Sequence, residues 1–226
     1  TAGEMVVAAY TVDGDEIWNT TVGEFVSAHG FCSCPVICGD LVIVNGDHDG
    51  DSYVVGLDRG TGAERWRYRR EYGIRSYATP LVRRYAGRRQ LILSGSQRIV
   101  SLNPLDGKRY WKIEGPTEQF VASMVDDGQH VFMACGFPDY HVMCIRPDGN
   151  GDVTDSAVVW HSRSARCYVP SPVVVDGYLL VADDRGTASC FDSATGERYW
   201  RARLGRGFGA SLVHAAGLVY FTDQDG

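Results

Sequence analysis

The sequence lacks several features that would assign it to a familiar class. No apolar run approaches the roughly 18 residues that a membrane-spanning helix needs, because Asp, Gly or Arg interrupts every apolar stretch. The formal net charge of -6 argues against general binding to nucleic-acid phosphates. No segment keeps an apolar period of 3.6 residues over the length of a helix. We therefore expect strands and turns, with neither a membrane span nor a nucleic-acid partner.

Motifs of common catalytic sites are also missing. The chain has no Gly-x-Ser-x-Gly elbow and no phosphate-binding glycine loop, and its six histidines show no nucleophile, base and acid spacing. The sequence therefore predicts no catalytic residues, and a role other than that of an enzyme is favoured.

Seven cysteines cannot all pair within one chain, so at least one remains a thiol. Cys32, Cys34 and Cys38 are spaced too irregularly for a zinc ribbon. Cys135 and Cys144 are expected on neighbouring strands of one hairpin, where they could form a cross-strand disulfide in an exported protein.

Tryptophan, by contrast, recurs at nearly constant intervals. Successive tryptophans are 48, 45, 49 and 40 residues apart: Trp18, Trp66, Trp111, Trp160 and Trp200. They end similar phrases, such as Asp58-Arg-Gly-Thr-Gly62-Ala-Glu-Arg-Trp66. The aspartate and the glycine predict a tight turn between two strands, and the indole should cover the seam between neighbouring sheets. Such a period indicates a repeated supersecondary unit.

An apolar pair that begins a strand forms a second repeat. The valines of these pairs are 46, 43, 48 and 40 residues apart: Val36, Val82, Val125, Val173 and Val213. Five copies of both patterns predict an all-β fold, a five-bladed β-propeller of four-stranded antiparallel blades.

The ends of the chain carry complementary halves of one repeat. The segment from Gly209 has only the first two strands, whereas the segment up to Thr20 has only the last two. We therefore expect the N- and C-terminal strands to pair and close the ring, which would remove an exposed sheet edge. The prediction is one domain, residues 1–226, with blades at 31–70, 71–115, 116–163 and 164–204, and a fifth that combines 205–226 with 1–25.

Two positions of each repeat could face the central axis. An aromatic residue stands five positions before each strand-start valine, and a charged residue or histidine stands seven before it. Side chains two apart on a strand point the same way. The predicted axial ligand-binding ring is His29, Phe31, Arg75, Tyr77, Glu118, Phe120, Arg166, Tyr168, Arg206 and Phe208. Its net positive charge could hold a carboxylate, phosphate or sulfate. The alternative is that the aromatics pack between blades and the charges are solvated.

Loops on the same face are acidic. They are the predicted loops between second and third strands, Asp47-His48-Asp49-Gly50-Asp51, Asp183-Asp184 and Asp223-Gln-Asp225. The first of these loops alternates Asp with other residues, and so does the insertion before Trp160, Asp148-Gly-Asn150-Gly-Asp152. Such loops resemble those that supply oxygen ligands to Ca²⁺. Both are short and lack a distal bidentate glutamate, so solvated turns are the alternative, and no metal site is assigned.

Arginine is locally frequent. Nine arginines lie between Arg65 and Arg89. Arg65, Arg67 and Arg69 alternate with Trp66 and Tyr68, as on an outer strand with one solvated face. The alternative is a surface for an acidic protein partner.

The phrase that ends in tryptophan resembles the Ala-x-Asp-x-x-Thr-Gly-x-x-x-Trp repeat of the pyrroloquinoline-quinone-like propellers. That family includes quinoprotein alcohol dehydrogenases and the outer-membrane assembly lipoprotein type of propeller, and the resemblance covers essentially the whole chain. The stretches Asp148-Gly-Asn-Gly-Asp-Val-Thr and Pro170-Ser-Pro-Val-Val-Val-Asp-Gly are similar to those of exported bacterial propellers. The resemblance implies an extracytoplasmic location. Known relatives usually have seven or eight blades rather than five.

The sequence is consistent with three candidate functions. The first is a non-catalytic binding or assembly module that holds a protein partner or ligand at the axial mouth. The second, implied by the resemblance, is a quinone-dependent oxidoreductase, whose relatives use a vicinal cysteine pair, a stacking tryptophan and a calcium shell. No Cys-Cys pair occurs here, and each tryptophan belongs to a repeat phrase, which disfavours pyrroloquinoline quinone. The third is a pocket for a small anionic ligand such as a sugar acid.

Overall fold

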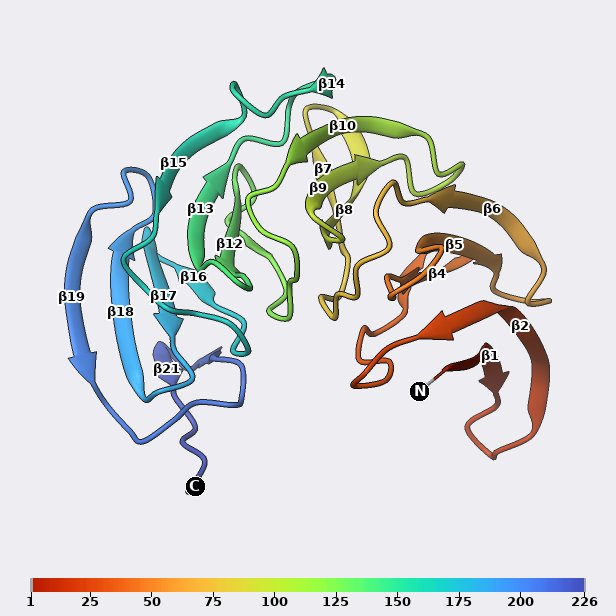
Figure 1. Cartoon of the computed structure of the whole chain (residues 1–226), viewed down its shortest axis with the longest axis horizontal. Helices are drawn as coiled ribbons and strands as arrows, with labels where there is room; N and C mark the ends of the chain where they lie inside the picture. Colours follow the sequence, from red (N-terminus) through yellow and green to blue (C-terminus); the bar gives the residue numbers. More distant parts are fainter. Residues whose placement is uncertain (1, 226) are drawn as a thin grey trace.

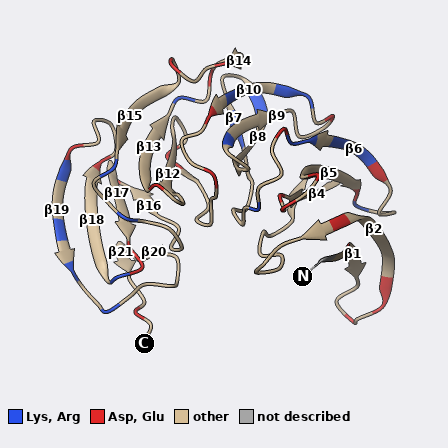
Figure 2. Ribbon diagram, viewed as in Figure 1, with Lys and Arg blue, Asp and Glu red and all other residues tan. Residues whose placement is uncertain are grey.

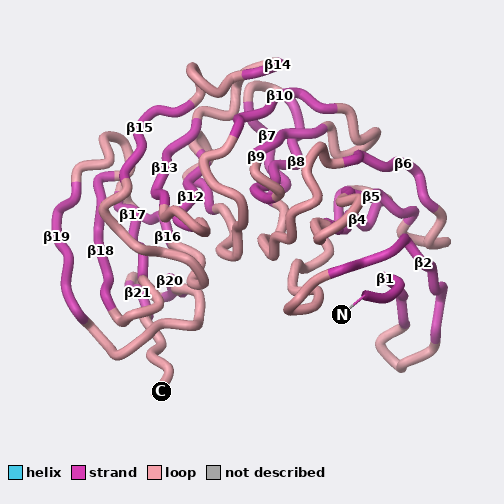
Figure 3. Tube along the Cα trace, in the orientation of Figure 1, coloured by secondary structure: helices cyan, strands magenta, loops and turns pink. Residues whose placement is uncertain are grey.

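The structure, a computed structural model, describes residues 2–225, which form strands, turns and loops without a helix (Figure 3). Accordingly, this part of the chain contains no helix long and apolar enough to cross a membrane. The predicted all-β class is confirmed.

The strands form four sheets of the repeat type and two shorter sheets at the ends. The N-terminal sheet pairs β1 (Ala2–Tyr10) with β2 (Glu16–Val26), and the C-terminal sheet pairs β20 (Val213–Ala215) with β21 (Leu218–Tyr220). The first complete sheet holds β3 (Val36–Cys38), β4 (Leu41–Gly46), β5 (Tyr53–Asp58) and β6 (Glu64–Arg69). The second holds β7 (Leu81–Tyr85), β8 (Arg88–Gly95), β9 (Arg98–Leu102) and β10 (Arg109–Glu114), with β14 (Gly151–Asp152) added at its edge. The third holds β11 (Val125–Asp126), β12 (Val131–Cys135), β13 (His141–Ile145) and β15 (Val158–Ser162). The fourth holds β16 (Val173–Val175), β17 (Tyr178–Ala182), β18 (Thr187–Asp192) and β19 (Arg198–Arg203).

The sheets follow one another around an arc (Figure 1). The first strands of consecutive sheets contact each other, β3 with β7, β11 with β16, and β16 with β20. The fourth strands β6, β10, β15 and β19 lie on the convex side (Figure 1). The segments that enter the first strands therefore lie on the concave side of the arc.

The hydrophobic core is divided among the seams between neighbouring sheets. Five separate clusters of buried residues fill the five seams of the described chain. The largest joins the second and third sheets and includes Trp111, Phe120 and Met133. Each sheet is thus stabilised by its neighbours, as in other repeat folds.

Tryptophan side chains cross these seams as predicted. The indole N–H groups of Trp18, Trp66 and Trp160 donate hydrogen bonds to main-chain oxygens of the next sheet, with N–O distances of 2.9, 3.1 and 2.8 Å. Each ring lies over a glycine in the next sheet's turn, namely Gly62, Gly107 and Gly196. An ideal Cβ at these glycines would lie 2.5, 2.6 and 2.5 Å from the indole, so no side chain fits there.

The short strand β14 is the main feature that the sequence did not predict. It belongs to the insertion before Trp160, but it pairs in parallel with β10 of the preceding sheet, Trp111 with Gly151 and Lys112 with Asp152. Val153 and Ala157 of the insertion pack in the same cluster as Trp111, whose side chain is fully buried. Residues of the insertion therefore cover Trp111, where a turn glycine lies against the tryptophan at the three seams just described.

The predicted pairing of the terminal strands is not observed. β1–β2 and β20–β21 are separate sheets, and an opening lies between the two ends of the chain (Figure 1). Neighbouring sheets pack face to face at an angle that arises from the twist of each sheet. Over the described sheets these angles produce an open arc.

The predicted disulfide is also absent, since all seven cysteines are free thiols. Cys135 lies opposite His141 in the β12–β13 ladder, whereas Cys144 lies opposite Phe132. Residues 132 and 135 point to opposite faces of β12. The two thiols accordingly belong to different seams, Cys135 to the second–third seam and Cys144 to the third–fourth seam.

Candidate functional site

The candidate site is the inner rim, which we define as residues 27–35, 70–80, 115–124, 163–172 and 204–212. These five segments enter β3, β7, β11, β16 and β20, and they reach toward the middle of the arc (Figure 1). Strands alternate in direction, so the same ends of the sheets also carry the loops between second and third strands.

A ladder of hydroxyl groups links the inner-rim segments. The main-chain N–H of Cys34 donates to the Thr79 hydroxyl, that of Thr79 to Ser123, that of Ser123 to Ser171, and that of Ser171 to Ser211, with distances of 3.0 to 3.1 Å. Each segment thereby holds the next. The recurrence of Ser or Thr two to three positions before the strand-start valine is the signal in the sequence from which this ladder could have been predicted.

The predicted aromatic ring residues do not form one exposed surface. Phe120 and Phe208 are fully buried in seams, and Tyr77 is buried with a hydroxyl that has no hydrogen-bond partner among described residues. Tyr168 is half-buried, and its hydroxyl lies 3.4 Å from Gln119 Oε1. Phe31 is the exception, with 42% of its surface exposed. Most of this set therefore stabilises the seams.

The predicted charged residues divide into paired and unpaired groups. Arg75 forms an ion pair with Asp49 at 2.6 Å, and the hydrogen bond to that carboxylate raises the Arg75 pKa. Arg206 lies 3.1 Å from Asp225. His29 lies near the Tyr77 ring, with 6.3 Å between ring centroids.

Glu118 and Arg166 are exposed, and neither side chain has a hydrogen-bonding or ionic partner in the part of the chain that the structure describes. With Phe31, they are the predicted residues that are free to contact a ligand.

Aspartates of the loops between second and third strands bind the inner-rim segments. Carboxylates of Asp49, Asp184 and Asp223 accept hydrogen bonds from main-chain N–H groups of Arg75, Val169 and Arg206, at 3.2, 3.1 and 2.7 Å. The bonds from residues 206, 207 and 224 lower the pKa of Asp223. These aspartates therefore accept hydrogen bonds from the main chain of the adjacent segment, as turn aspartates commonly do.

Asp47 is committed to a buried ion pair. Its carboxylate lies 2.9 Å from Arg70 Nε, and both side chains are almost fully inaccessible. Arg70 also donates to the Gly95 carbonyl oxygen. Asp47 and Asp49 are thus engaged by arginines, whereas Asp51 is exposed. No group of three or more His, Cys, Asp or Glu side chains suited to a metal occurs within residues 2–225.

The second predicted cation loop fixes the insertion instead. Arg88 donates to Asn150 Oδ1 at 2.7 Å, and Arg146 pairs with Asp148 at 3.0 Å. The Thr154 hydroxyl and main-chain N–H, together with Lys112, lower the pKa of Asp152 to about 2. This loop therefore anchors β14.

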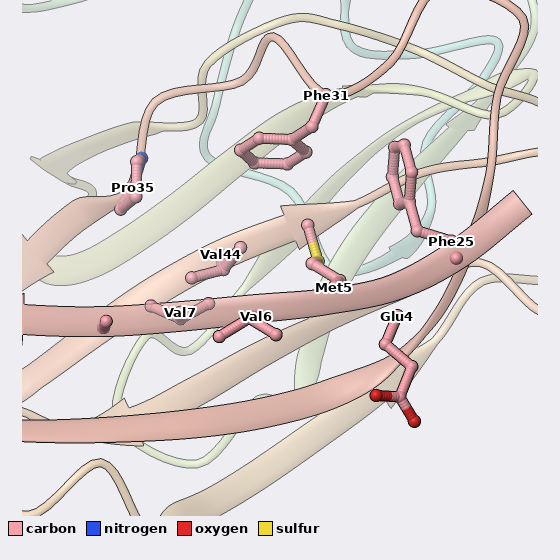
Figure 4. A pocket seen from close by; sticks show the side chains of 10 residues that line it. Glu4, Met5, Val6, Val7, Phe25, Phe31, Pro35 and Val44 are labelled. Atoms are coloured by element: carbon pink, nitrogen blue, oxygen red, sulfur yellow. The ribbon is translucent and has the colours of Figure 1, made fainter. Parts of the chain in front are cut away.

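An apolar groove opens beside Phe31 (Figure 4). It has a volume of about 480 Å³ and lies between β1 and the β3–β6 sheet. Met5, Val7, Phe25 and Val44 line it, and Phe31 packs edge-on against Phe25 with 5.7 Å between centroids. The inner rim thus combines an apolar groove with separate unpaired charges.

Lysine and arginine residues are prominent on the outer strands β6, β10 and β19 (Figure 2). Several are paired: Arg65 with Asp58, Arg67 with Glu64 and Arg109 with Glu71. These ion pairs agree with the predicted outer strand that has one solvated face.

Comparison with known proteins identifies a matching family and several similar structures. A family model described as outer membrane protein assembly factor BamB matches residues 1–145 and 150–226. BamB from Moraxella catarrhalis is similar in structure, with a TM-score of 0.60 and 19% identity over 95% of this chain and 60% of that chain. No curated protein matches by sequence.

Two dehydrogenases share the fold. A europium-containing methanol dehydrogenase has a TM-score of 0.72 and 12% identity, over 93% of this chain and 59% of that chain. A quinohemoprotein alcohol dehydrogenase from Comamonas testosteroni has a TM-score of 0.68 and 12% identity, over 96% and 52%. The chain thus spans between about half and three-fifths of these structures, and identities this low show a common fold alone.

Proposed function

Because the chain belongs to the family described as outer membrane protein assembly factor BamB, we propose that it is a non-catalytic binding module in the assembly of outer-membrane proteins. The observation that carries the proposal is the family match over nearly the whole chain. An extracytoplasmic location follows from that role. The partner is a protein, and no residue of this chain is assigned a catalytic step.

We propose that the partner contacts the inner rim. The hydroxyl ladder links the segments of this surface to one another, and segments ordered before binding lose less conformational entropy on binding. Phe31 offers an exposed aromatic ring beside an apolar groove, and Arg166 offers an unpaired guanidinium. Aromatic and arginine side chains often contribute most to protein–protein binding.

A binding measurement tests this proposal. The probe is a urea-unfolded outer-membrane β-barrel protein that carries a fluorophore and is diluted into buffer. We expect Phe31→Ser combined with Arg166→Ala to weaken binding about tenfold by fluorescence anisotropy, since two such contacts contribute on the order of 1–2 kcal/mol.

The matched control is Leu105→Ser. Leu105 is 58% exposed and lies in the β9–β10 turn, at the opposite end of the strands from the inner rim. Its substitution should leave the dissociation constant unchanged. Unchanged binding by the double variant, or equal weakening by the control, would contradict the proposed surface.

The oxidoreductase alternative is supported by fold similarity alone. The resemblance implies a vicinal cysteine pair and a free stacking tryptophan for pyrroloquinoline quinone. The sequence has no adjacent cysteines, and three indoles are already bonded across seams. These residues do not fit the cofactor. An absorbance change on adding the quinone with Ca²⁺ would favour this alternative over binding alone.

The anionic-pocket alternative is weakened by pairing within the protein. Arg75 and Arg206 form ion pairs with Asp49 and Asp225, so Arg166 is the unpaired arginine of the predicted ring within the described residues. We place this alternative behind protein binding.

We also propose that residues 1–226 form a single propeller domain with five blades, in which the terminal hairpins are halves of one blade. β20–β21 supplies two inner strands, and β1–β2 supplies the two outer strands. Trp200 is 39% exposed, and Gly14, four positions before Trp18, has no atom near the position of a Cβ. At three other seams this glycine position lies beneath the preceding tryptophan, which supports the pairing of Trp200 with Gly14.

A further inference from the structure

Two histidines of the third complete sheet face each other edge to edge. His141 begins β13 and His161 lies on the neighbouring strand β15. His141 Nδ1 is 2.7 Å from His161 Nε2. The ring centroids are 4.9 Å apart, and the planes differ by 16°. At this separation the two rings lie nearly in one plane, and one N–H points at the lone pair of the other nitrogen.

A thioether lies on the same face of the sheet. Met143 is directly opposite His161 in the β13–β15 ladder and two residues from His141 on β13. Directly opposed residues, and residues two apart on a strand, share a face. Met143 and His141 are 3% and 4% exposed, whereas His161 is exposed to solvent. The three side chains thus form a set that is buried at one end and open at the other.

The contact itself requires a nitrogen lone pair. A neutral imidazole has one N–H and one unprotonated nitrogen, so the hydrogen bond between His141 Nδ1 and His161 Nε2 joins an N–H of one ring to a lone pair of the other. Nε2 of His141 is buried and has no partner within the described residues.

We propose that His141, His161 and Met143 form a binding site for Cu(I). Imidazole nitrogen suits copper, and a thioether selects its soft monovalent state. The cation would replace the shared N–H···N bond, with His141 Nδ1 and His161 Nε2 as ligands. The two rings would move apart to admit it, because metal–nitrogen distances are about 2 Å and the nitrogens are now 2.7 Å apart. The displaced hydrogen moves to the other nitrogen of its own ring, so both imidazoles stay neutral and no net proton is released.

Neighbouring groups are compatible with a monovalent cation. Arg163 is the next charge along the chain after β15, and it is paired with Asp139 at 2.5 Å. Cys135 lies opposite His141 in the β12–β13 ladder, but its sulfur is hydrogen-bonded to the Val121 N–H and the Tyr168 carbonyl oxygen. Both bonds engage the Cys135 sulfur with inner-rim segments, so we leave it outside the proposed ligand set.

The test uses the full chain in a Cys32→Ser/Cys34→Ser background, because these two thiols are exposed and would bind Cu(I) themselves. Anaerobic titration with Cu(I) against a colorimetric chelator should show one equivalent bound. His161→Gln should lower the affinity at least about tenfold. His130→Gln, which alters a histidine of the β11–β12 turn, should leave the affinity unchanged.

Met143→Leu distinguishes the ligand set from a structural effect, since this swap nearly conserves volume. It should weaken Cu(I) binding several-fold while leaving Zn²⁺ binding unchanged, and the ¹⁵N resonance of His161 Nε2 should shift on Cu(I) addition in the Cys32→Ser/Cys34→Ser background. Cu(I) binding that survives His161→Gln, or an Nε2 resonance that does not move, would overturn the site. This test is independent of the partner-binding measurement.

Discussion

The Asp47–Arg70 pair shows how single charged residues hold the inner rim in place. Arg70 follows β6, Asp47 follows β4, and the Gly95 carbonyl oxygen belongs to the next sheet. Two charges buried this deeply are costly to desolvate, so each depends on the other. The pair fixes the start of the segment that carries Arg75 and Tyr77.

We expect Asp47→Asn to destabilise the protein by about 3–5 kcal/mol, because it leaves the Arg70 charge buried without a counter-ion. Urea denaturation followed by tryptophan fluorescence measures the change. The control is Arg65→Gln, which breaks the exposed ion pair with Asp58 and should cost about 1 kcal/mol or less. Similar small losses in both variants would contradict the buried pair's role.

The candidate site could be predicted only in part at the level of residues. Spacing from the strand-start valines identified the inner-rim positions, and Phe31, Glu118 and Arg166 are exposed there. The same spacing also selected Phe120 and Phe208, which are buried in seams. Alternation along a strand identifies residues that share a face. Whether that face is buried depends on the neighbouring sheet, and the sequence of the strand itself does not show this.

Among the structural elements, β14 connects two sheets that the repeat pattern treats as separate. It extends the outer edge of β10 by a parallel strand, so the insertion protects an edge that would otherwise be open. Asp152 anchors this strand through Thr154 and Lys112. The ionised carboxylate is therefore the form that stabilises the insertion.

This anchor predicts an acid-dependent contribution to stability. The folded protein holds the Asp152 pKa at about 2, below its ordinary value of 3.8. The stabilisation is thus present above about pH 4 and is lost as pH falls toward 2. The difference in urea midpoint between the wild type and Asp152→Asn should be largest at pH 6 and disappear near pH 2.

Asp155→Asn is the matched control for this measurement. Asp155 is exposed in the same insertion, and no described residue donates a hydrogen bond to its carboxylate. The wild type and this control should differ equally at both pH values. A pH-independent loss in Asp152→Asn would show that the carboxylate charge does not hold β14.

Elements with local signals were predictable, and elements with long-range partners were not. In the turn before Trp66, Asp58 Oδ1 accepts hydrogen bonds from the main chain of Gly60 and Thr61, as the phrase predicted. The pairing of β14 with β10 joins residues about 40 positions apart in sequence. Because β14 consists of two residues and shows no apolar alternation, its sequence does not indicate the strand with which it pairs.

At the scale of the whole molecule, stability is distributed along the arc. Each seam has its own cluster of buried residues, so each sheet depends mainly on its nearest neighbours. The terminal hairpins have a neighbour on one side within the described chain. Trp200 on β19 is exposed because the following β20–β21 sheet has no third and fourth strands whose turn could cover it, whereas Trp66 is buried at an equivalent position.

The closure of the arc can be tested at Gly14. In a closed blade the Trp200 indole would cover Gly14, as indoles cover Gly62, Gly107 and Gly196. Gly14→Val would then clash with the ring, at an extra cost of about 2 kcal/mol. This should lower Tm by roughly 4–8 °C more than backbone strain alone, as measured by differential scanning calorimetry.

Gly128→Val supplies the strain control. Gly14 and Gly128 have φ values of 96° and 88°, and neither has an atom within 4 Å of an ideal Cβ. Valine at positive φ should cost about 1–2 kcal/mol at either position. Closure therefore predicts a larger loss at Gly14, whereas an arc that stays open predicts equal losses. A Trp200→Ala change that leaves Tm unaltered would independently favour the open arc, because a seam tryptophan contributes about 3–5 kcal/mol.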